Sequence, residues 1–155
     1  MAAAISVATI RNTAYNVIKT QEVRRIVNGD FSMEEFTRFE KDLLRASQAV
    51  PSTLGGGQHG HAWLVKNEAD YKSLTGDDSL VQHDIANPGL TPAIGSNDSH
   101  AVIALKTATL IAANDAYHTQ EGVKAGLRDL IIGRVPAVAI QELDDNQFGF
   151  AKILP

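Results

Sequence analysis

The strongest structural signal in this sequence is a helix start at residues 31–36. Ser32 is a favourable N-cap residue and Glu35 follows it three residues later, which is the spacing of a capping box. Phenylalanines and leucines then recur every three or four residues, while charged residues occupy the opposite face. Pro51 cannot continue a helix because it lacks a backbone N–H. The sequence therefore predicts an amphipathic helix over about residues 33–48.

The segment before this helix allows two interpretations. Val7 and Ile10 belong to a stripe with helical spacing, whereas the alternation that begins at Ile5 and Val7 would also fit an edge strand. We favour a helix over roughly residues 8–20, followed by a short apolar piece at 23–27 that an Asn-Gly turn closes. The first few residues are expected to form an arm.

The second half of the chain contains further helical patterns around one long irregular stretch. Residues 77–96 combine turn-forming residues with little periodicity, so we expect a long loop there. The run Asn97-Asp98-Ser99 then caps a segment that is apolar on nearly all sides, which predicts a central buried helix to about Tyr117. Thr119 is expected to cap a further helix that ends at Gly133. Two shorter helices are predicted to begin near Asn67 and Pro136.

These patterns predict a mainly α fold, with a compact helical domain of about five to six helices, a long central loop and extended terminal arms. Residues 1–22 would form an N-terminal arm and helix, and residues 23–155 one helical assembly domain. The length of 155 residues is that of one domain, and 44% hydrophobic with 21% charged residues is an ordinary globular composition. This composition argues against wholesale disorder.

The composition also excludes several classes of function. The chain has no cysteine, which rules out a disulfide scaffold, a zinc finger or knuckle, and a cysteine nucleophile. Its net charge of −4 has the wrong sign for a protein dominated by phosphate binding. No apolar run is long enough for a membrane helix, and the start lacks the basic region of a signal peptide. We therefore expect a protein of the cytoplasm, or of an assembled particle, with no signal peptide and no transmembrane segment.

A glycine- and histidine-rich segment after Pro51 is the one local feature that suggests chemistry. No Lys-Ser or Lys-Thr follows at the spacing of a phosphate-binding loop. His59 and His61 are separated by a single residue, and in an extended loop such side chains are expected to point to opposite sides. A metal site there would therefore need further ligands from distant residues. We favour a structural role, in which the glycines permit positive φ and the imidazoles hydrogen-bond to loop carbonyls. The residues of this segment are Gly55, Gly56, Gly57, His59, Gly60 and His61.

Apolar residues near both ends of the chain are candidates for contacts between copies. An arm that docks head to tail on a neighbour builds a filament if the arrangement does not close, and a ring if it does. Trp63, the only tryptophan, is expected to anchor a core or an interface rather than a ligand. The candidate assembly residues are Ile5, Val7, Ile10, Trp63, Phe148, Phe150, Ile153 and Leu154.

Several segments of the chain together form a known pattern. It begins with Arg25-Ile26-Val27, continues with the capped helix and includes the run from Val50 to His61. Further along come Val135-Pro136, the acidic piece Glu142-Leu143-Asp144-Asp145 and the ending Gly149-Phe150-Ala151. This pattern resembles the Gag-like, capsid-type N-terminal region of copia-type LTR retrotransposon polyproteins of diatoms, oomycetes and other microbial eukaryotes. The resemblance spans about residues 24–153, and its most specific part is the Gly-Gly-Gly-x-His-Gly-His segment.

The resemblance implies a structural role rather than catalysis. Gag domains associate with copies of themselves into shells or tubes around RNA and carry no catalytic residues. The relatives often have a Cys/His knuckle for RNA, which a chain without cysteine lacks, so neither charge nor a knuckle supports RNA as a partner here. We therefore expect a non-enzymatic, self-assembling protein that needs no cofactor and has itself as partner. The alternatives are a small metal-assisted enzyme that uses His59 and His61, or a module whose 77–96 loop binds another protein.

Overall fold

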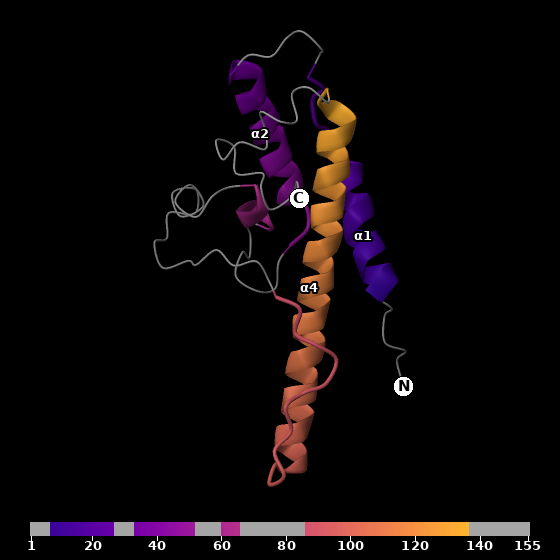
Figure 1. Cartoon of the computed structure of the whole chain (residues 1–155), viewed down its shortest axis with the longest axis vertical. Coiled ribbons are helices and arrows are strands. Elements are labelled where there is room, and N and C mark those ends of the chain that lie inside the picture. The colour runs from indigo at the N-terminus through magenta and orange to yellow at the C-terminus, as the bar shows by residue number, and fades with distance from the viewer. Residues whose placement is uncertain (1–6, 27–32, 52–59, 66–85, 137–155) are drawn as a thin grey trace.

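The computed structural model describes residues 7–26, 33–51, 60–65 and 86–136. These ranges contain three α-helices and one short 3₁₀-helix, and they contain no strand. The prediction of a mainly helical fold is therefore confirmed. The helices are α1 (Val7–Lys19), α2 (Met33–Ser47), η1 (Ala62–Leu64) and α4 (His100–Arg134). Figure 1 shows α4 as a long central rod, with α1 along one side of its C-terminal half and α2 on the other.

The long helix α4 is one continuous element of 35 residues, about 52 Å at 1.5 Å per residue. Its predicted cap is confirmed, since the Ser99 side chain accepts a hydrogen bond from the backbone N–H of Val102 at 3.2 Å. The predicted break between Tyr117 and Thr119 is wrong. The Thr119 hydroxyl donates to the Asp115 carbonyl of its own helix at 2.7 Å, so it does not act as a cap.

Helix α1 packs closely against the C-terminal half of α4. A Cβ added at Gly122 would overlap the Arg11 carbonyl oxygen and approach the Ala14 Cβ to 2.9 Å. A Cβ at Gly126 would lie 2.7 Å from the Ile18 Cβ. The two glycines thus allow the helix backbones to approach, and Ala14 and Ile18 are buried in the resulting contact. The predicted helix over residues 8–20 is confirmed, and the alternative of an edge strand is wrong for the described residues from Val7 onward.

The hydrophobic core lies between α1, α2, η1 and the C-terminal half of α4. Helix α2 begins and ends within one residue of its prediction, and it contributes Phe36, Phe39 and Leu43 to the core. The described part of the predicted short apolar piece, residues 23–26, forms neither helix nor strand, and the Ile26 N–H donates to the Arg134 carbonyl at 2.8 Å. Residues of α1 belong to the same core as those of α2, so residues 7–22 and the start of the 23–155 domain pack as one body.

The N-terminal half of α4 projects beyond this core (Figure 1). The expected burial of this segment is wrong, because Val102, Leu105 and Ile111 are 39%, 67% and 57% exposed, and burial begins only at Ala116. The physical reason is length: α1 has 13 residues and α2 has 15, so neither reaches along a 35-residue helix. The domain is therefore less compact than predicted.

The described end of the predicted loop, residues 86–96, contains no helix or strand. Residues 77–85 and the helices expected from Asn67 and beyond Pro136 lie outside the described ranges, as does the predicted cap residue Ser32.

Candidate functional site

The Gly/His segment is described from Gly60 onward, and there it anchors η1 to the end of α2. The backbone N–H of His61 donates to the Ser47 carbonyl, one of the last carbonyls of α2, at 2.9 Å. Gly60 has φ of +56°, and a Cβ there would lie 2.8 Å from the Cα of Gln48. This position requires glycine for both conformation and space, as the structural interpretation predicted.

The His61 side chain is buried and bonded to the backbone. Its Nδ1 donates to the Val50 carbonyl at 2.8 Å, and its ring lies 5.0 Å from the Trp63 ring. Burial lowers the pKa of His61, and the hydrogen bond to Val50 opposes this shift only in part. The imidazole is thus a neutral core group rather than an exposed ligand. Within the described ranges no three histidine or acidic side chains form a group that would hold a metal ion.

The remaining residues of this segment are outside the described part of the chain. They are Gly55, Gly56, Gly57 and His59.

The described candidates for assembly fall into two groups. Trp63 is 2% exposed, and its Nε1 donates to the buried Gln120 side chain at 3.2 Å. It therefore anchors the core of the single chain, which leaves its ring inaccessible to a neighbouring copy. Val7 is 46% exposed at the start of α1, and Ile10 borders an apolar groove of about 400 Å³ between α1 and residues 49–51. The other candidates, Ile5, Phe148, Phe150, Ile153 and Leu154, lie outside the described residues.

Another apolar surface lies on the projecting half of α4, which we define as residues 100–115. Val102, Leu105, Thr109 and Ala112 follow one another at spacings of three and four, so they form one stripe along the helix. Alanines at other exposed positions widen the apolar face beyond this stripe. The sequence predicts burial for this segment because it is apolar on nearly all sides, whereas the structure leaves the stripe exposed.

Residues 86–99 run back along one side of the projecting half and brace it. The Lys106 ammonium group contacts the Asp98 carboxylate at 2.7 Å and the Ala93 carbonyl at 2.9 Å. The Asn114 side chain donates to the Gly89 carbonyl at 2.9 Å, which ties the far end of the segment to the helix. The contact with Lys106 and the Gly95 N–H lower the pKa of Asp98. These bonds hold the segment on one side of α4, and the apolar face remains exposed.

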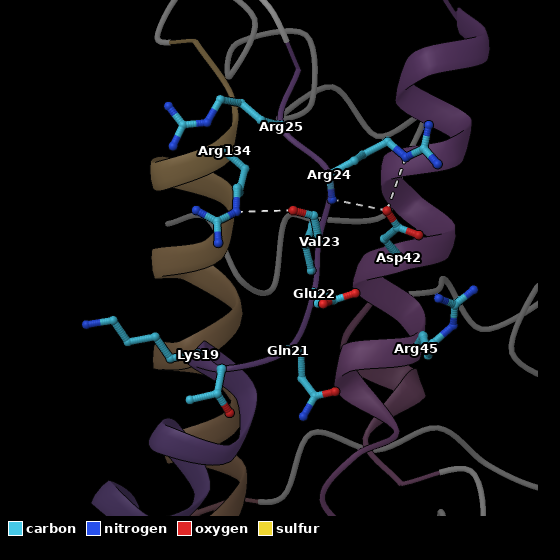
Figure 2. A pocket seen from close by; sticks show the side chains of 10 residues that line it. Lys19, Gln21, Glu22, Val23, Arg24, Arg25, Asp42, Arg45 and Arg134 are labelled. Carbon is cyan, nitrogen blue, oxygen red and sulfur yellow. Dashed lines mark hydrogen bonds and ion pairs between the residues drawn. The ribbon is translucent and has the colours of Figure 1, made fainter.

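A second surface is a polar cleft between the C-terminal end of α4 and α2. Its volume is about 790 Å³, and residues 20–25 pass through it between the two helices (Figure 2). Five basic side chains and two acidic ones line it, a local excess of positive charge in a chain of net charge −4. The basic residues are Lys19, Arg24, Arg25, Arg45 and Arg134.

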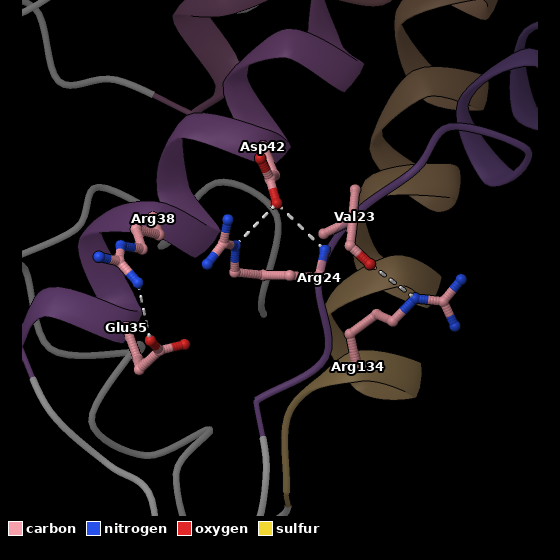
Figure 3. A network of polar contacts seen from close by, with 6 residues as sticks. All are labelled: Val23, Arg24, Glu35, Arg38, Asp42 and Arg134. Atoms are coloured by element: carbon pink, nitrogen blue, oxygen red, sulfur yellow. Dashed lines mark hydrogen bonds and ion pairs between the residues drawn. The ribbon is translucent and has the colours of Figure 1, made fainter.

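The polar contacts beside this cleft hold its central segment in place (Figure 3). The Asp42 carboxylate accepts hydrogen bonds from the backbone N–H and the Nε of Arg24, both at 3.1 Å. Nε of Arg134 donates to the Val23 carbonyl at 3.1 Å. Residues 22–26 are thereby tied to α2 on one side and to α4 on the other. No local sequence pattern indicates this cleft, because its basic residues are spread from position 19 to position 134.

Comparison with known proteins found no matching family model, no matching curated protein and no matching solved structure. Among the described residues, no helix combines the length and the apolar character needed to cross a bilayer.

Proposed function

We propose that this protein is a non-enzymatic structural protein that associates with copies of itself through the projecting half of α4. The observation that carries the proposal is the exposed apolar face of residues 100–115, on a helix that extends beyond its own core. Monomeric proteins rarely leave such contiguous apolar surfaces in water, and surfaces of this kind mark interaction sites.

The character of this face favours a second copy of the chain as its occupant. Within residues 100–115 only Lys106 and Asp115 carry a permanent charge, and Asp98 already neutralises Lys106. A charged partner would therefore find only Asp115 to pair with, whereas a largely uncharged face is complementary to an identical one. The spacing of Val102, Leu105, Thr109 and Ala112 is that of a helix seam, in which two helices pack side by side.

The geometry of the projection also suits self-association. Residues 100–115 form about four turns, or roughly 24 Å of helix. Two copies related by a two-fold axis perpendicular to α4 would lay these halves against each other in antiparallel orientation, and each would cover the face that the other exposes. The braced segment 86–99 borders the stripe and lines an apolar groove of about 510 Å³ with Leu105 and Thr109, which both remain exposed.

A two-fold contact of this kind makes a dimer, and a polymer needs a second contact. We propose that the apolar residues near the ends of the chain supply it, including the exposed Val7. The resemblance to Gag-like capsid regions supports this proposal, with a shell, tube or filament as the product. The complete assembly unit would then have about five to six helices and terminal arms, and it would act in the cytoplasm or inside the assembled particle.

The test is a matched set of lysine substitutions on α4. Leu105→Lys and Ile111→Lys place a charge on the projecting face, at exposed positions where the fold of the single chain does not depend on them. Losing a buried Leu or Ile from each of two copies costs about 3 kcal/mol, and the dissociation constant should rise by a factor of about 100 or more. Ile132→Lys is the control, because Ile132 is 51% exposed on the same helix but lies outside the projecting half.

Sedimentation velocity at matched concentrations gives the comparison. The two projecting-half variants should shift to smaller species, whereas the Ile132→Lys protein should sediment as the unaltered chain does. Identical sedimentation of all four proteins would show that the projecting half of α4 makes no contact between copies.

A further inference from the structure

The cleft between α2 and the end of α4 gathers basic side chains, and only some of them form ion pairs or hydrogen bonds within the described part of the chain. Arg25 and Arg45 have no acidic partner among the described residues, and both are exposed. Arg134 uses Nε for its bond to Val23, which leaves its two terminal nitrogens without a partner in the described part of the chain. Lys19 lies 5.4 Å from the centre of the Tyr15 ring and contacts no described carboxylate.

The positions of these side chains form two banks. In Figure 2, Arg24 and Arg45 lie on the side of α2, while Lys19, Arg25 and Arg134 lie on the side of α4. Residues 21–23 pass between the banks. In Figure 2 the Lys19 and Arg25 side chains extend away from this segment on one side and the Arg45 side chain on the other, so an anion bound at the segment would be met by these side chains turning toward it.

We propose that this cleft binds a compact ligand with several linked phosphate groups, of the oligophosphate class. Four of its five basic residues are arginines, whose planar forks form paired hydrogen bonds with phosphate oxygens. With two acidic residues in the lining, the cleft carries a net charge of about +3. A chain of two or three phosphates matches that charge within the volume of about 790 Å³.

A compact ligand fits the charge distribution better than an extended polyanion does. Three basic residues outside the cleft on the described surface pair with acidic neighbours: Arg38 with Glu34 and Glu35, Lys124 with Glu121, and Lys106 with Asp98. Arg11 bonds to the His118 ring, and Lys41 and Arg128 do not line the cleft. The cleft gathers five basic residues in one place, which suits a compact ligand better than the long basic track that an extended nucleic acid strand requires.

The rigidity of the central segment supports a preformed site. Arg24 is fixed by two bonds to Asp42, and the backbone of Ile26 is bonded to the Arg134 carbonyl. The segment that separates the banks is thus held before any ligand arrives, so binding costs little ordering of the backbone. The ion pair with Asp42 keeps the Arg24 guanidinium oriented, and it also neutralises the negative charge of Asp42.

The experiment is a calorimetric titration of the full chain with sodium tripolyphosphate at low ionic strength. We expect one ligand per chain, with an affinity that falls as salt is added. Replacing both arginines that lack a partner, Arg25→Gln with Arg45→Gln, should weaken binding at least tenfold. Arg128→Gln is the matched control, since Arg128 is an exposed cation of α4 outside the cleft, and its loss should change the affinity less than twofold. Circular dichroism of each variant checks that the helices are unchanged.

Four results would overturn the proposal. The first is the absence of binding at millimolar tripolyphosphate. The second is an equal loss of affinity in the Arg128→Gln protein, which would indicate general charge attraction. The third is equally tight binding of hexaglutamate, which would make the site one for carboxylates. The fourth is binding of a 20-nucleotide single-stranded RNA through Arg25 and Arg45 when tripolyphosphate does not bind.

Discussion

The close contact between α1 and α4 makes a sharp prediction about three glycines on one helix. Gly122 and Gly126 face α1, whereas a Cβ added at Gly133 would meet no atom within 4 Å. All three are helical, so replacing any of them by alanine gains the same helix propensity, about 0.8–1 kcal/mol. Only the first two substitutions add an atom to a filled space. The difference in unfolding free energy between the Gly122→Ala or Gly126→Ala protein and the Gly133→Ala protein therefore reports the packing of α1 on α4.

The magnitude follows from what the added methyl group meets. At Gly122 it would overlap the Arg11 carbonyl oxygen, which is backbone and cannot rotate away, and at Gly126 it would press on the Ile18 side chain. Overpacking of this kind costs about 1–3 kcal/mol or more, which exceeds the propensity gain. After the propensity gain is subtracted from a cost near the upper end of this range, we expect Gly122→Ala to lower the free energy of unfolding by about 1–2 kcal/mol. Gly126→Ala should lower it less, and Gly133→Ala should raise it by about 0.5–1 kcal/mol.

The assay is urea denaturation monitored by the fluorescence of Trp63, the only tryptophan, which is buried in the same core. Circular dichroism at the same urea concentrations reports loss of the helices and tests for a single transition. Equal stability of the Gly122→Ala and Gly133→Ala proteins would refute the close packing of α1 on α4. Urea series should be run at one low protein concentration, because self-association would also stabilise the folded state.

Two further predictions concern ionisable groups. Burial lowers the pKa of His61 below the usual 6.5, so the unfolded chain binds more protons and stability should fall below pH 6.5, by up to about 1.4 kcal/mol per pH unit. His61→Asn should reduce the dependence of unfolding free energy on pH, measured by urea denaturation at several pH values. The part that remains would come from His118, because burial also lowers the pKa of His118. An unchanged pH dependence would contradict the role of His61. The Gly95 amide resonance should titrate with a midpoint below 3.8, because Lys106 lowers the pKa of Asp98. Loss of that titration step in Asp98→Asn confirms its source, and a midpoint at or above 3.8 argues against the brace.

The sequence patterns that mark helix starts and amphipathic faces predicted the described helices well, because these patterns depend only on neighbouring residues. The amphipathic pattern that begins near Met33 and the cap at Ser99 both act within one or two turns, and the structure has helices at both places. The predicted helix break at Thr119 is wrong, and the reason is also local. A threonine caps a helix only if the preceding residues leave the helical conformation, and here its hydroxyl bonds to the carbonyl four residues earlier.

Features that depend on distant residues were not predictable from the sequence. Gly122 matters only because Arg11 lies against it, and no local pattern links positions 111 residues apart. The basic cleft likewise joins the end of α1 to the end of α4. The exposure of Leu105 was missed because an apolar helix looks the same in sequence whether its partner belongs to its own chain or to a neighbouring copy.

Self-association through α4 is tested most simply by the mass of the undenatured protein. Sedimentation equilibrium of the unaltered chain over a range of micromolar concentrations gives that mass without reference to shape. If the projecting halves of α4 pair, the mass should rise with concentration to at least twice the 16.6 kDa of one chain. A single species of 16.6 kDa at every concentration would refute the pairing.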